Sequence, residues 1–243
     1  MLSAALIERR EAAPGHFLLT IERPEGWSFR AGQFARLGLE VGGEPVFRAY
    51  SIASAPSDAK TLEFLIKAQP GGTLSPRLTS LPEGSAVLID GPAQGSFGPR
   101  RIPGGEAIWL FATGPGLAPF LSLLKDRKAL SAWREVRCVV GASYRAQSDA
   151  LAALAAEAGE GLAGFSVMSA ASREPGPLTG RLTALLRDGE LERAAGRAAA
   201  KETDRVMLCG NENFVADMRA IFKERGIVSP RLGRPRELVA ELL

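Results

Sequence analysis

Residues 107–124, AIWLFATGPGLAPFLSLL, are the stretch that decides the fold. The stretch carries no charge and is long enough to cross a bilayer as a helix. It is interrupted by four residues that break helices, Gly114, Pro115, Gly116 and Pro119. The stretch therefore predicts a buried strand, then a tight turn and a helix, and not a membrane span.

Downstream of this stretch, apolar runs alternate with segments of helical period. The helical stripes are Leu117, Phe120, Leu121 and Leu124, and later Phe214, Met218, Ile221 and Phe222. The apolar runs lie at 108–112, 136–141, 164–169 and 205–210. This alternation is typical of βαβ units on a parallel sheet.

Upstream, short β-rich runs are separated by Gly and Pro, which is the spacing of an antiparallel barrel. In the run 61–68, Leu62, Phe64 and Ile66 form a core face, while Glu63, Leu65 and Lys67 alternate with them and face solvent. The other runs are 16–21, 33–39, 47–54 and 86–91. The sequence thus predicts two domains, an antiparallel β-barrel over 1–102 and an α/β parallel-sheet domain over 103–243.

Composition narrows the function classes. The chain has 243 residues, 46% hydrophobic and 23% charged, with a net charge of +3, which excludes disorder and is too small an excess for a dedicated nucleic-acid binder. The spacing of the two cysteines, Cys138 and Cys209, does not indicate a zinc site. One histidine, His16, cannot build a His-rich metal centre, and two cysteines cannot hold a four-thiolate iron–sulfur cluster. Any redox chemistry therefore needs an organic cofactor or an external partner.

The amino terminus, MLSAALIERRE, has about seven apolar residues before its charges, which is short for a signal-peptide core of roughly 7–15. We therefore expect a cytoplasmic protein with reduced cysteines and no membrane or nucleic-acid partner. We expect a monomer.

The first candidate site motif is Arg48-Ala49-Tyr50-Ser51, at the end of a β-run. An arginine fork suits a phosphate, a tyrosine ring can lie against a planar cofactor, and a serine hydroxyl can bond a ring nitrogen. The alternative is an arginine and a tyrosine that merely sit on a barrel surface.

A second motif, residues 71–78 (GGTLSPRL), has glycines followed by Ser75 as a candidate N-cap, with proline at the first helical position. A helix N-terminus of this kind can hold an anion. An ordinary capped helix is the alternative.

Further candidates follow the predicted parallel strands, at the carboxyl edge where such sheets bind ligands. Thr113-Gly114 opens a strand–turn–helix that lacks the last glycine of G-x-G-x-x-G but can place backbone amides on a pyrophosphate. Ser172-Arg173 and Arg181 suit a 2′-phosphate, which indicates NADP over NAD. Cys209-Gly210-Asn211 ends another strand, and Cys209 is alternatively a small buried hydrophobe.

In this order the motifs resemble those of the short bacterial ferredoxin/flavodoxin–NADP⁺ reductases over nearly the whole chain. The resemblance rests on the motifs above together with Leu178-Thr179-Gly180-Arg181 and Met207-Leu208. It implies an FAD site in the first domain and an NADP(H) site in the second. It also implies hydride transfer between NADPH and FAD, and single-electron exchange with ferredoxin or flavodoxin.

The resemblance also implies residue roles. Arg48 would hold the FAD pyrophosphate, Tyr50 the isoalloxazine ring, Ser51 would lie near flavin N5, and Ala49, Gly72, Thr73, Leu74 and Ser75 would complete the FAD site. Thr113 and Gly114 would face the pyrophosphate and nicotinamide, Arg173 and Arg181 the 2′-phosphate, and Ser172, Gly210 and Asn211 would line the same site. Ser51, Tyr50 and Cys209 would be catalytic, with Cys209 beside the position of hydride transfer.

Three departures from the family pattern stand out. Pro115 replaces a frequent threonine, Arg145 lies two places beyond a frequent adenosine-phosphate arginine and is assigned that role, and the tail ends early at Glu241-Leu242-Leu243. Two related functions remain open, an oxygenase reductase component and a free-flavin reductase. A non-catalytic nucleotide-binding regulator is a third, which the joint presence of Arg48, Tyr50, Ser51 and Cys209 disfavours. The net positive charge of the chain would help to attract an acidic carrier protein.

Overall fold

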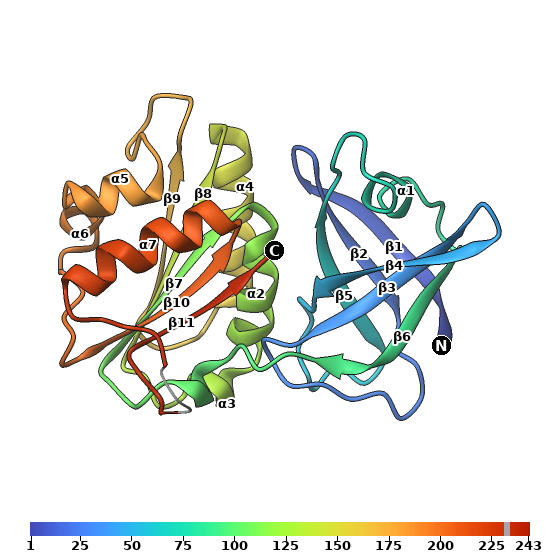
Figure 1. The fold of residues 1–243 in the computed structure, drawn as a ribbon, viewed down its shortest axis with the longest axis horizontal. Coiled ribbons are helices and arrows are strands. Elements are labelled where there is room, and N and C mark those ends of the chain that lie inside the picture. The colour runs from blue at the N-terminus through green and yellow to red at the C-terminus, as the bar shows by residue number, and fades with distance from the viewer. Residues whose placement is uncertain (231–233) are drawn as a thin grey trace.

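Two sheets divide the chain (Figure 1). The computed structural model describes residues 1–230 and 234–243. Strands β1 to β6 form a six-stranded antiparallel sheet, here called the antiparallel half, and strands β7 to β11 form a five-stranded parallel sheet, the parallel half. The predicted fold class is confirmed.

The antiparallel half has the strand order β4-β3-β6-β1-β2-β5. Its outer strands β4 and β5 meet only through the isolated pair Ile52–Phe64 in the described chain, so the barrel-like sheet is not closed by a ladder. Its elements are β1 (Leu2–Ala13), β2 (His16–Glu22), β3 (Phe34–Val41), β4 (Glu44–Ser51), β5 (Thr61–Lys67), α1 (Ser75–Leu78) and β6 (Ala86–Gln94), followed by the connecting turn η1 (Pro99–Arg101).

The parallel half has the strand order β11-β10-β7-β8-β9. Its elements are β7 (Ala107–Thr113), η2 (Gly114–Leu117), α2 (Ala118–Lys125), α3 (Arg127–Leu130), β8 (Glu135–Ala142), α4 (Arg145–Ala158), β9 (Phe165–Ala171), α5 (Leu182–Arg187), α6 (Glu190–Ala195), β10 (Asp204–Gly210), α7 (Glu212–Glu224) and β11 (Leu238–Leu242). Strand β7 is buried over 107–112 and β10 throughout, as expected of parallel strands covered on both faces.

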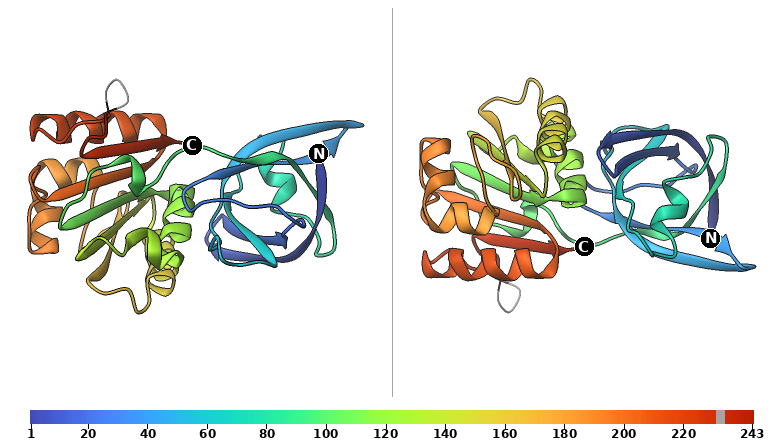
Figure 2. Two further views of the ribbon diagram at one scale, coloured as in Figure 1. Left: turned by 90° about the horizontal axis from the view of Figure 1, so that it is seen from below. Right: turned by 90° about the horizontal axis from the view of Figure 1, so that it is seen from above.

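Helices cover both faces of the parallel sheet (Figure 2). The stripe of Leu117, Phe120, Leu121 and Leu124 in η2 and α2 is buried on one face together with α4. The stripe of α7, from Phe214 to Phe222, is buried on the other face with α5 and α6. Both predicted helical stripes are confirmed. No helix in the ranges 1–230 and 234–243 is long and apolar enough to cross a membrane.

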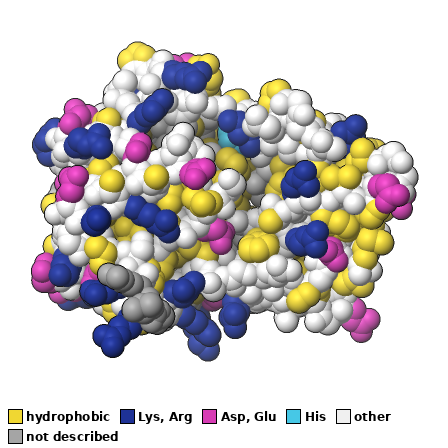
Figure 3. Space-filling view, viewed as in Figure 1, with side chains coloured by type: hydrophobic (Ala, Val, Ile, Leu, Met, Phe, Trp, Pro, Cys, Tyr) yellow, Lys and Arg dark blue, Asp and Glu magenta, His cyan; other side chains and the backbone are white. Residues whose placement is uncertain are grey.

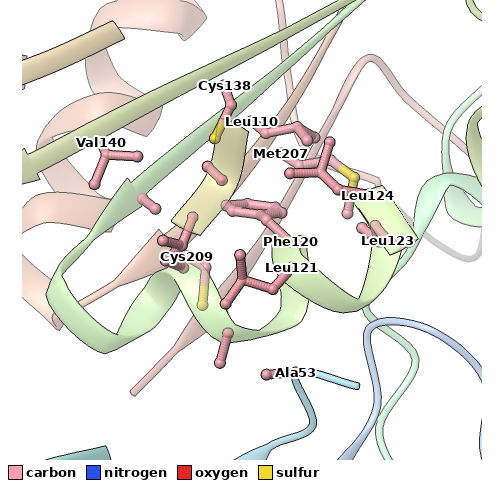
Figure 4. Packing of buried hydrophobic residues seen from close by; sticks show 14 of the residues in the cluster. Ala53, Leu110, Phe120, Leu121, Leu123, Leu124, Cys138, Val140, Met207 and Cys209 are labelled. Atoms are coloured by element: carbon pink, nitrogen blue, oxygen red, sulfur yellow. The ribbon is translucent and has the colours of Figure 1, made fainter. Parts of the chain in front are cut away.

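The two halves share a core, here called the seam cluster, in which Leu18, Ala53 and Leu65 pack with Phe120 and Leu121 of α2. Figure 4 shows Ala53 facing Leu121 beneath the parallel half. The expectation that Leu65 faces solvent is wrong. Leu65 is only 3% exposed because the parallel half covers it.

Polar contacts reinforce the seam. The hydroxyl of Ser122 in α2 donates to the carbonyl oxygen of Ser54 at 2.8 Å, in a buried position. The ammonium of Lys125 pairs with the carboxylate of Glu63 on β5. One helix, α2, therefore packs against the sheet behind it and against the antiparallel half in front.

Candidate functional site

A cleft of about 570 Å³ opens at the carboxyl edge of the parallel sheet. Residues that follow β7, β8, β9 and β10 line it, and His16 and Lys67 of the antiparallel half close its other side. Figure 3 shows this hollow between the two halves, with histidine atoms inside it. In the strand order, β8 lies on one side of β7 and β10 on the other, so the direction of the chain reverses at β7. Open α/β sheets bind ligands at the carboxyl edge beside such a reversal.

The cleft brings together six of the residues proposed for NADP(H), and three of the others lie outside its lining. The lining includes Thr113, Gly114, Ser172, Arg173, Arg181 and Asn211. Arg145, Cys209 and Gly210 are not part of that lining. Most residues expected at the carboxyl edge therefore lie together, and their binding of NADP(H) stays a prediction.

Thr113 lines the cleft and carries a buried hydroxyl. Its Oγ1 has no hydrogen-bond partner in the described chain, and buried polar groups without a partner are rare. Gly210 makes room for it, since a Cβ on Gly210 would lie 2.2 Å from Thr113 Oγ1 and 2.7 Å from the Phe214 ring. The arrangement leaves a buried hydroxyl without a partner beside the cleft.

The turn after β7 needs its glycines. Gly114 has φ +53°, a left-handed conformation that favours glycine. A Cβ on Gly116 would lie 2.3 Å from the carbonyl oxygen of Cys209, so η2 packs directly on the end of β10. Through this contact the predicted strand–turn–helix reaches the neighbouring strand end.

Arg173 and Arg181 are exposed at the edge of the cleft, and neither forms an ion pair within the described residues. The guanidinium of Arg173 lies 5.8 Å from the centroid of the Tyr144 ring. Arg173 Nη1 also donates to the Tyr144 hydroxyl at 3.4 Å. Two guanidinium groups that have no carboxylate partner on one side of a cleft suit a phosphate monoester.

Arg145 is placed differently from this pair. Its Nη2 donates to the carbonyl oxygen of Leu178 at 3.3 Å, Nη1 lies 4.0 Å from Asp149, and its backbone N–H bonds the Glu174 carboxylate. The side chain therefore holds the loop over 174–179, and its role as a phosphate ligand stays a prediction.

Asn211 has a structural role as well as a place in the lining. Its Oδ1 accepts a hydrogen bond from the backbone N–H of Phe214 at 3.0 Å and so caps α7. This cap fixes the turn after β10 beside the cleft.

The motif on β4 places a cation and an aromatic ring at the strand's end. Arg48 is exposed, donates from Nη1 to the carbonyl oxygen of Phe47 at 2.7 Å and forms no ion pair in the described ranges. Ala49 is exposed beside it. Tyr50 packs half-buried against the antiparallel core, and burial raises the pKa of its phenol to about 12. An unpaired guanidinium next to a flat ring fits a phosphorylated aromatic ligand.

The expectation that Ser75 caps a helix is wrong. Helix α1 has four residues and begins at Ser75, with Leu74 in the capping position and no side-chain cap. Ser75 Oγ instead accepts from the backbone N–H of Gln69 at 3.2 Å, and a Cβ on Gly72 would lie 3.0 Å from the Gln69 carbonyl oxygen. The motif is a tight polar loop, with Thr73 exposed, not the start of a long helix.

This loop and the β4 motif rest on one core. Leu74 and Leu78 are buried in the cluster against which Tyr50 packs. The fold therefore brings the two sequence motifs, separated by about twenty positions, onto the same part of the antiparallel half.

A functional residue that the motifs missed is Glu241. The Ser51 hydroxyl donates to Glu241 Oε1 at 3.2 Å, and burial raises the pKa of the Glu241 carboxyl to about 7. In the parallel register Glu241 lies beside Cys209, whose thiol is fully buried with its pKa raised by burial and then by Glu241. A lone glutamate near a chain end forms no motif, so only the strand pairing reveals it.

These donors fit two dinucleotides better than a metal. Unpaired guanidinium groups, a glycine-tight loop, an orphaned hydroxyl and a half-buried ring are groups that hold phosphates and aromatic rings. No cluster of three or more His, Cys, Asp or Glu side chains capable of holding a metal occurs in the described part of the chain.

Comparison with known proteins supports this assignment. Residues 14–97 match the family described as oxidoreductase FAD-binding domain. The chain is 40% identical over 203 residues to the flavodoxin/ferredoxin–NADP reductase of Escherichia coli K12, covering 83% of this chain and 81% of that protein. It is 35% identical over 235 residues to ferredoxin–NADP reductase A of Sorangium cellulosum, covering 93% and 84%.

A solved structure agrees over the full length. The crystal structure of a ferredoxin NADP⁺ reductase from Neisseria gonorrhoeae with bound FAD and NADP superposes with a TM-score of 0.89 at 30% identity. The match covers 99% of this chain and 98% of that one. The similarity therefore extends through both halves and the seam between them.

Proposed function

This chain belongs to the ferredoxin/flavodoxin–NADP reductase family, and we propose that it is the FAD-dependent enzyme that exchanges electrons between NADPH and a ferredoxin or flavodoxin. The observation that carries the proposal is the hydrogen bond between Ser51 and Glu241. It joins the end of the Arg48–Ser51 motif to the carboxyl edge of the parallel sheet. The two cofactor sites therefore meet where a hydride has to pass.

We assign FAD to residues 1–102 and NADP(H) to residues 103–243. Bound FAD supplies a centre that takes up a hydride from NADPH and releases its electrons singly. Arg48 would neutralise the FAD pyrophosphate, and Tyr50 would pack against the flavin ring. The loop from Gly72 to Ser75 would donate backbone N–H groups to the phosphates.

In the parallel half, the orphaned Thr113 hydroxyl and the turn at Gly114 would meet the NADP(H) backbone. Arg173 and Arg181 would hold its 2′-phosphate, because both line the cleft and neither forms an ion pair in the described residues. Cys209 is buried behind the turn, where its thiol would define the shape of the nicotinamide position and not act as a nucleophile.

Ser51 and Glu241 would handle protons at the seam. A carboxyl with a pKa near 7 holds or releases a proton in the neutral range. Its hydrogen-bond partner Ser51 is 7% exposed and would lie between this carboxyl and the flavin. Because the single hydroxyl hydrogen of Ser51 is donated to Glu241, the Ser51 oxygen would act as an acceptor toward the place where the two rings would meet.

A second groove, of about 670 Å³, supplies a docking surface for the carrier. It is lined by the exposed cations Arg30, Arg100, Arg101 and Lys128, with Asp126 as the one acidic residue in the described lining. Gly95 lies in this groove, and a Cβ on it would be 3.8 Å from Glu241 Oε2. Four positive side chains beside the redox centre suit an acidic carrier.

Because Cys138 and Cys209 are buried free thiols, we place the enzyme in a reducing cytoplasm.

The test is direct. The purified protein should be yellow, should bleach under NADPH without oxygen, and should reduce cytochrome c faster when ferredoxin or flavodoxin is added. NADH serves as the matched control nucleotide. A colourless protein that cannot be reconstituted with FAD would rule out the proposed function, and reduction of free flavin without any effect of the carriers would favour a flavin reductase instead.

A further inference from the structure

His16 contributes to the NADP(H) cleft from the opposite half of the molecule. It begins β2 of the antiparallel half, is 1% exposed, and lines the cleft with Thr113 and Gly114. It is the only histidine of the chain. No motif in the sequence marks it, and the assigned cofactor residues do not include it.

The imidazole orientation is fixed by one carbonyl. His16 Nδ1 lies 3.0 Å from the carbonyl oxygen of Pro14, and Gln147 Nε2 on α4 donates to the same oxygen at 3.1 Å. A carbonyl only accepts hydrogen bonds, so Nδ1 carries the hydrogen. In the neutral ring, Nε2 is therefore an acceptor with a free lone pair.

This acceptor has no partner in the protein. His16 Nε2 is buried without a hydrogen bond within the described residues. A Cβ on Gly114 would lie 3.3 Å from it, so the nitrogen faces the turn after β7. Burial lowers the pKa of the ring, and the positive charge of Lys67 lowers it too. The hydrogen bond to Pro14 and the charge of Glu11 oppose this shift without cancelling it, so the ring stays neutral near pH 7.

We propose that His16 Nε2 accepts a hydrogen bond from the nicotinamide riboside end of NADP(H), from a ribose hydroxyl or the carboxamide N–H, and so positions that end. This inference rests on the proposed function. Phosphate oxygens offer no hydrogen to a neutral imidazole, so the donor belongs to the sugar or the amide. Buried acceptors are nearly always paired, and the cleft supplies the missing partner.

The strand order selects this end of the nucleotide. Arg173 follows β9 at one end of the sheet order, and Glu241 lies in β11 at the other. The turn at Gly114 follows β7, between them. A nucleotide whose 2′-phosphate is held at Arg173 and whose nicotinamide reaches Glu241 therefore passes His16 beyond its 2′-phosphate end.

The experiment compares two ligands by isothermal titration calorimetry. NADP⁺ carries the nicotinamide riboside, and adenosine 2′,5′-bisphosphate carries only the 2′-phosphate end. His16→Phe should weaken NADP⁺ binding about five- to tenfold, the scale of one hydrogen bond, and leave the bisphosphate unchanged. His16→Gln, which retains a carbonyl acceptor, should restore part of the loss. Thermal unfolding of each variant is the control for folding.

A second readout needs no variant. In protein labelled with ¹⁵N-histidine, the single Nε2 resonance should shift with NADP⁺ and stay in place with the bisphosphate. Equal weakening of both ligands by His16→Phe, or an Nε2 resonance that ignores NADP⁺ while NADP⁺ binds, overturns the inference. Failure of the unaltered protein to bind NADP⁺ at all instead refutes the proposed function, so the two failures are distinct.

Discussion

Ser51 donates its hydroxyl hydrogen to Glu241 at 3.2 Å, although 190 positions separate the two residues along the chain. Ser51 ends β4 of the antiparallel half and Glu241 lies in β11 of the parallel half. Their hydrogen bond therefore reports directly on how the two halves sit together. It also places a carboxyl with a pKa near 7 at the proposed redox centre.

Replacement of Glu241 by Gln should change how stability depends on pH. Burial raises the Glu241 pKa from 4.5 to about 7 in the folded protein, so the folded state binds the proton more tightly than the unfolded state. The free energy of unfolding of the unaltered protein should therefore fall, relative to that of Glu241→Gln, as pH rises from 4.5 to 7. Urea unfolding at several pH values measures this, and a constant difference between the two proteins would contradict it.

Replacement of Ser51 by Ala should raise the Glu241 pKa further. The hydrogen bond from Ser51 stabilises the ionised carboxylate and so lowers the Glu241 pKa, whereas burial raises it. Without the hydrogen bond, the effect of burial is no longer offset by it. Carboxyl resonances followed by NMR across the titration measure the shift. Ser54→Ala is the matched serine variant, because the Ser54 hydroxyl bonds the backbone N–H of Glu63 and not Glu241. A Glu241 pKa that stays unchanged or falls in Ser51→Ala would show that the hydrogen bond is not formed in solution.

Replacement of Arg173 and Arg181 by Ala should impair use of NADPH much more than use of NADH. Each guanidinium is exposed in the cleft and would pair with a 2′-phosphate that NADH lacks, a loss of about 1.5–3 kcal/mol per charged hydrogen bond. Steady-state kinetics with both nucleotides give the KM values. Arg187→Ala, at the far end of α5, is the control. Equal effects on NADPH and NADH would remove the NADP assignment.

Replacement of Tyr50 by Ala should weaken FAD retention, because the ring would supply contact area to the flavin. Tyr50→Phe keeps the ring and should hold FAD nearly as well. Flavin absorbance per protein after gel filtration measures occupancy. Full occupancy in Tyr50→Ala would show that the ring is not a stacking partner.

Replacement of Gly116 by Ala should destabilise the protein by about 1–3 kcal/mol, since the added Cβ would lie 2.3 Å from the Cys209 carbonyl oxygen. Gly104→Ala is the matched control because nothing lies within 4 Å of its added Cβ. Urea midpoints compare the two variants. Equal midpoints would mean that η2 does not press on the end of β10.

The hydrophobic pattern of the sequence predicted those helices and strands whose buried residues recur with a regular spacing or form an unbroken apolar run. The stripes of α2 and α7 and the buried strands around β7 carry strong periodic signals, and the structure has them in place. Strand β1 has no such signal, because its middle, from Ile7 to Glu11, is exposed and mostly charged. Strand β11 has only five residues, of which the first two are buried and only the last is exposed, so it too lacks a pattern.

Tertiary contacts decided what the pattern missed. Leu65 alternates like a solvent-facing residue and is buried only because α2 and the seam cluster cover it. Ser75 has the composition of a cap, but a four-residue helix offers it nothing to cap and it bonds Gln69 instead. Glu241 and His16 acquire their surroundings from strands far away in the sequence, which local spacing does not encode.

Helix α2 has a mechanical consequence for the whole molecule. Its apolar residues are buried from both sides, and Ser122 anchors it to the backbone at Ser54. Moving the halves apart would expose those apolar surfaces to water and break the hydrogen bond of Ser122. The nucleotide therefore enters a cleft that is already formed, without closure of one half onto the other. Heat or denaturant should accordingly melt the chain in a single cooperative transition, with neither half surviving the loss of the other.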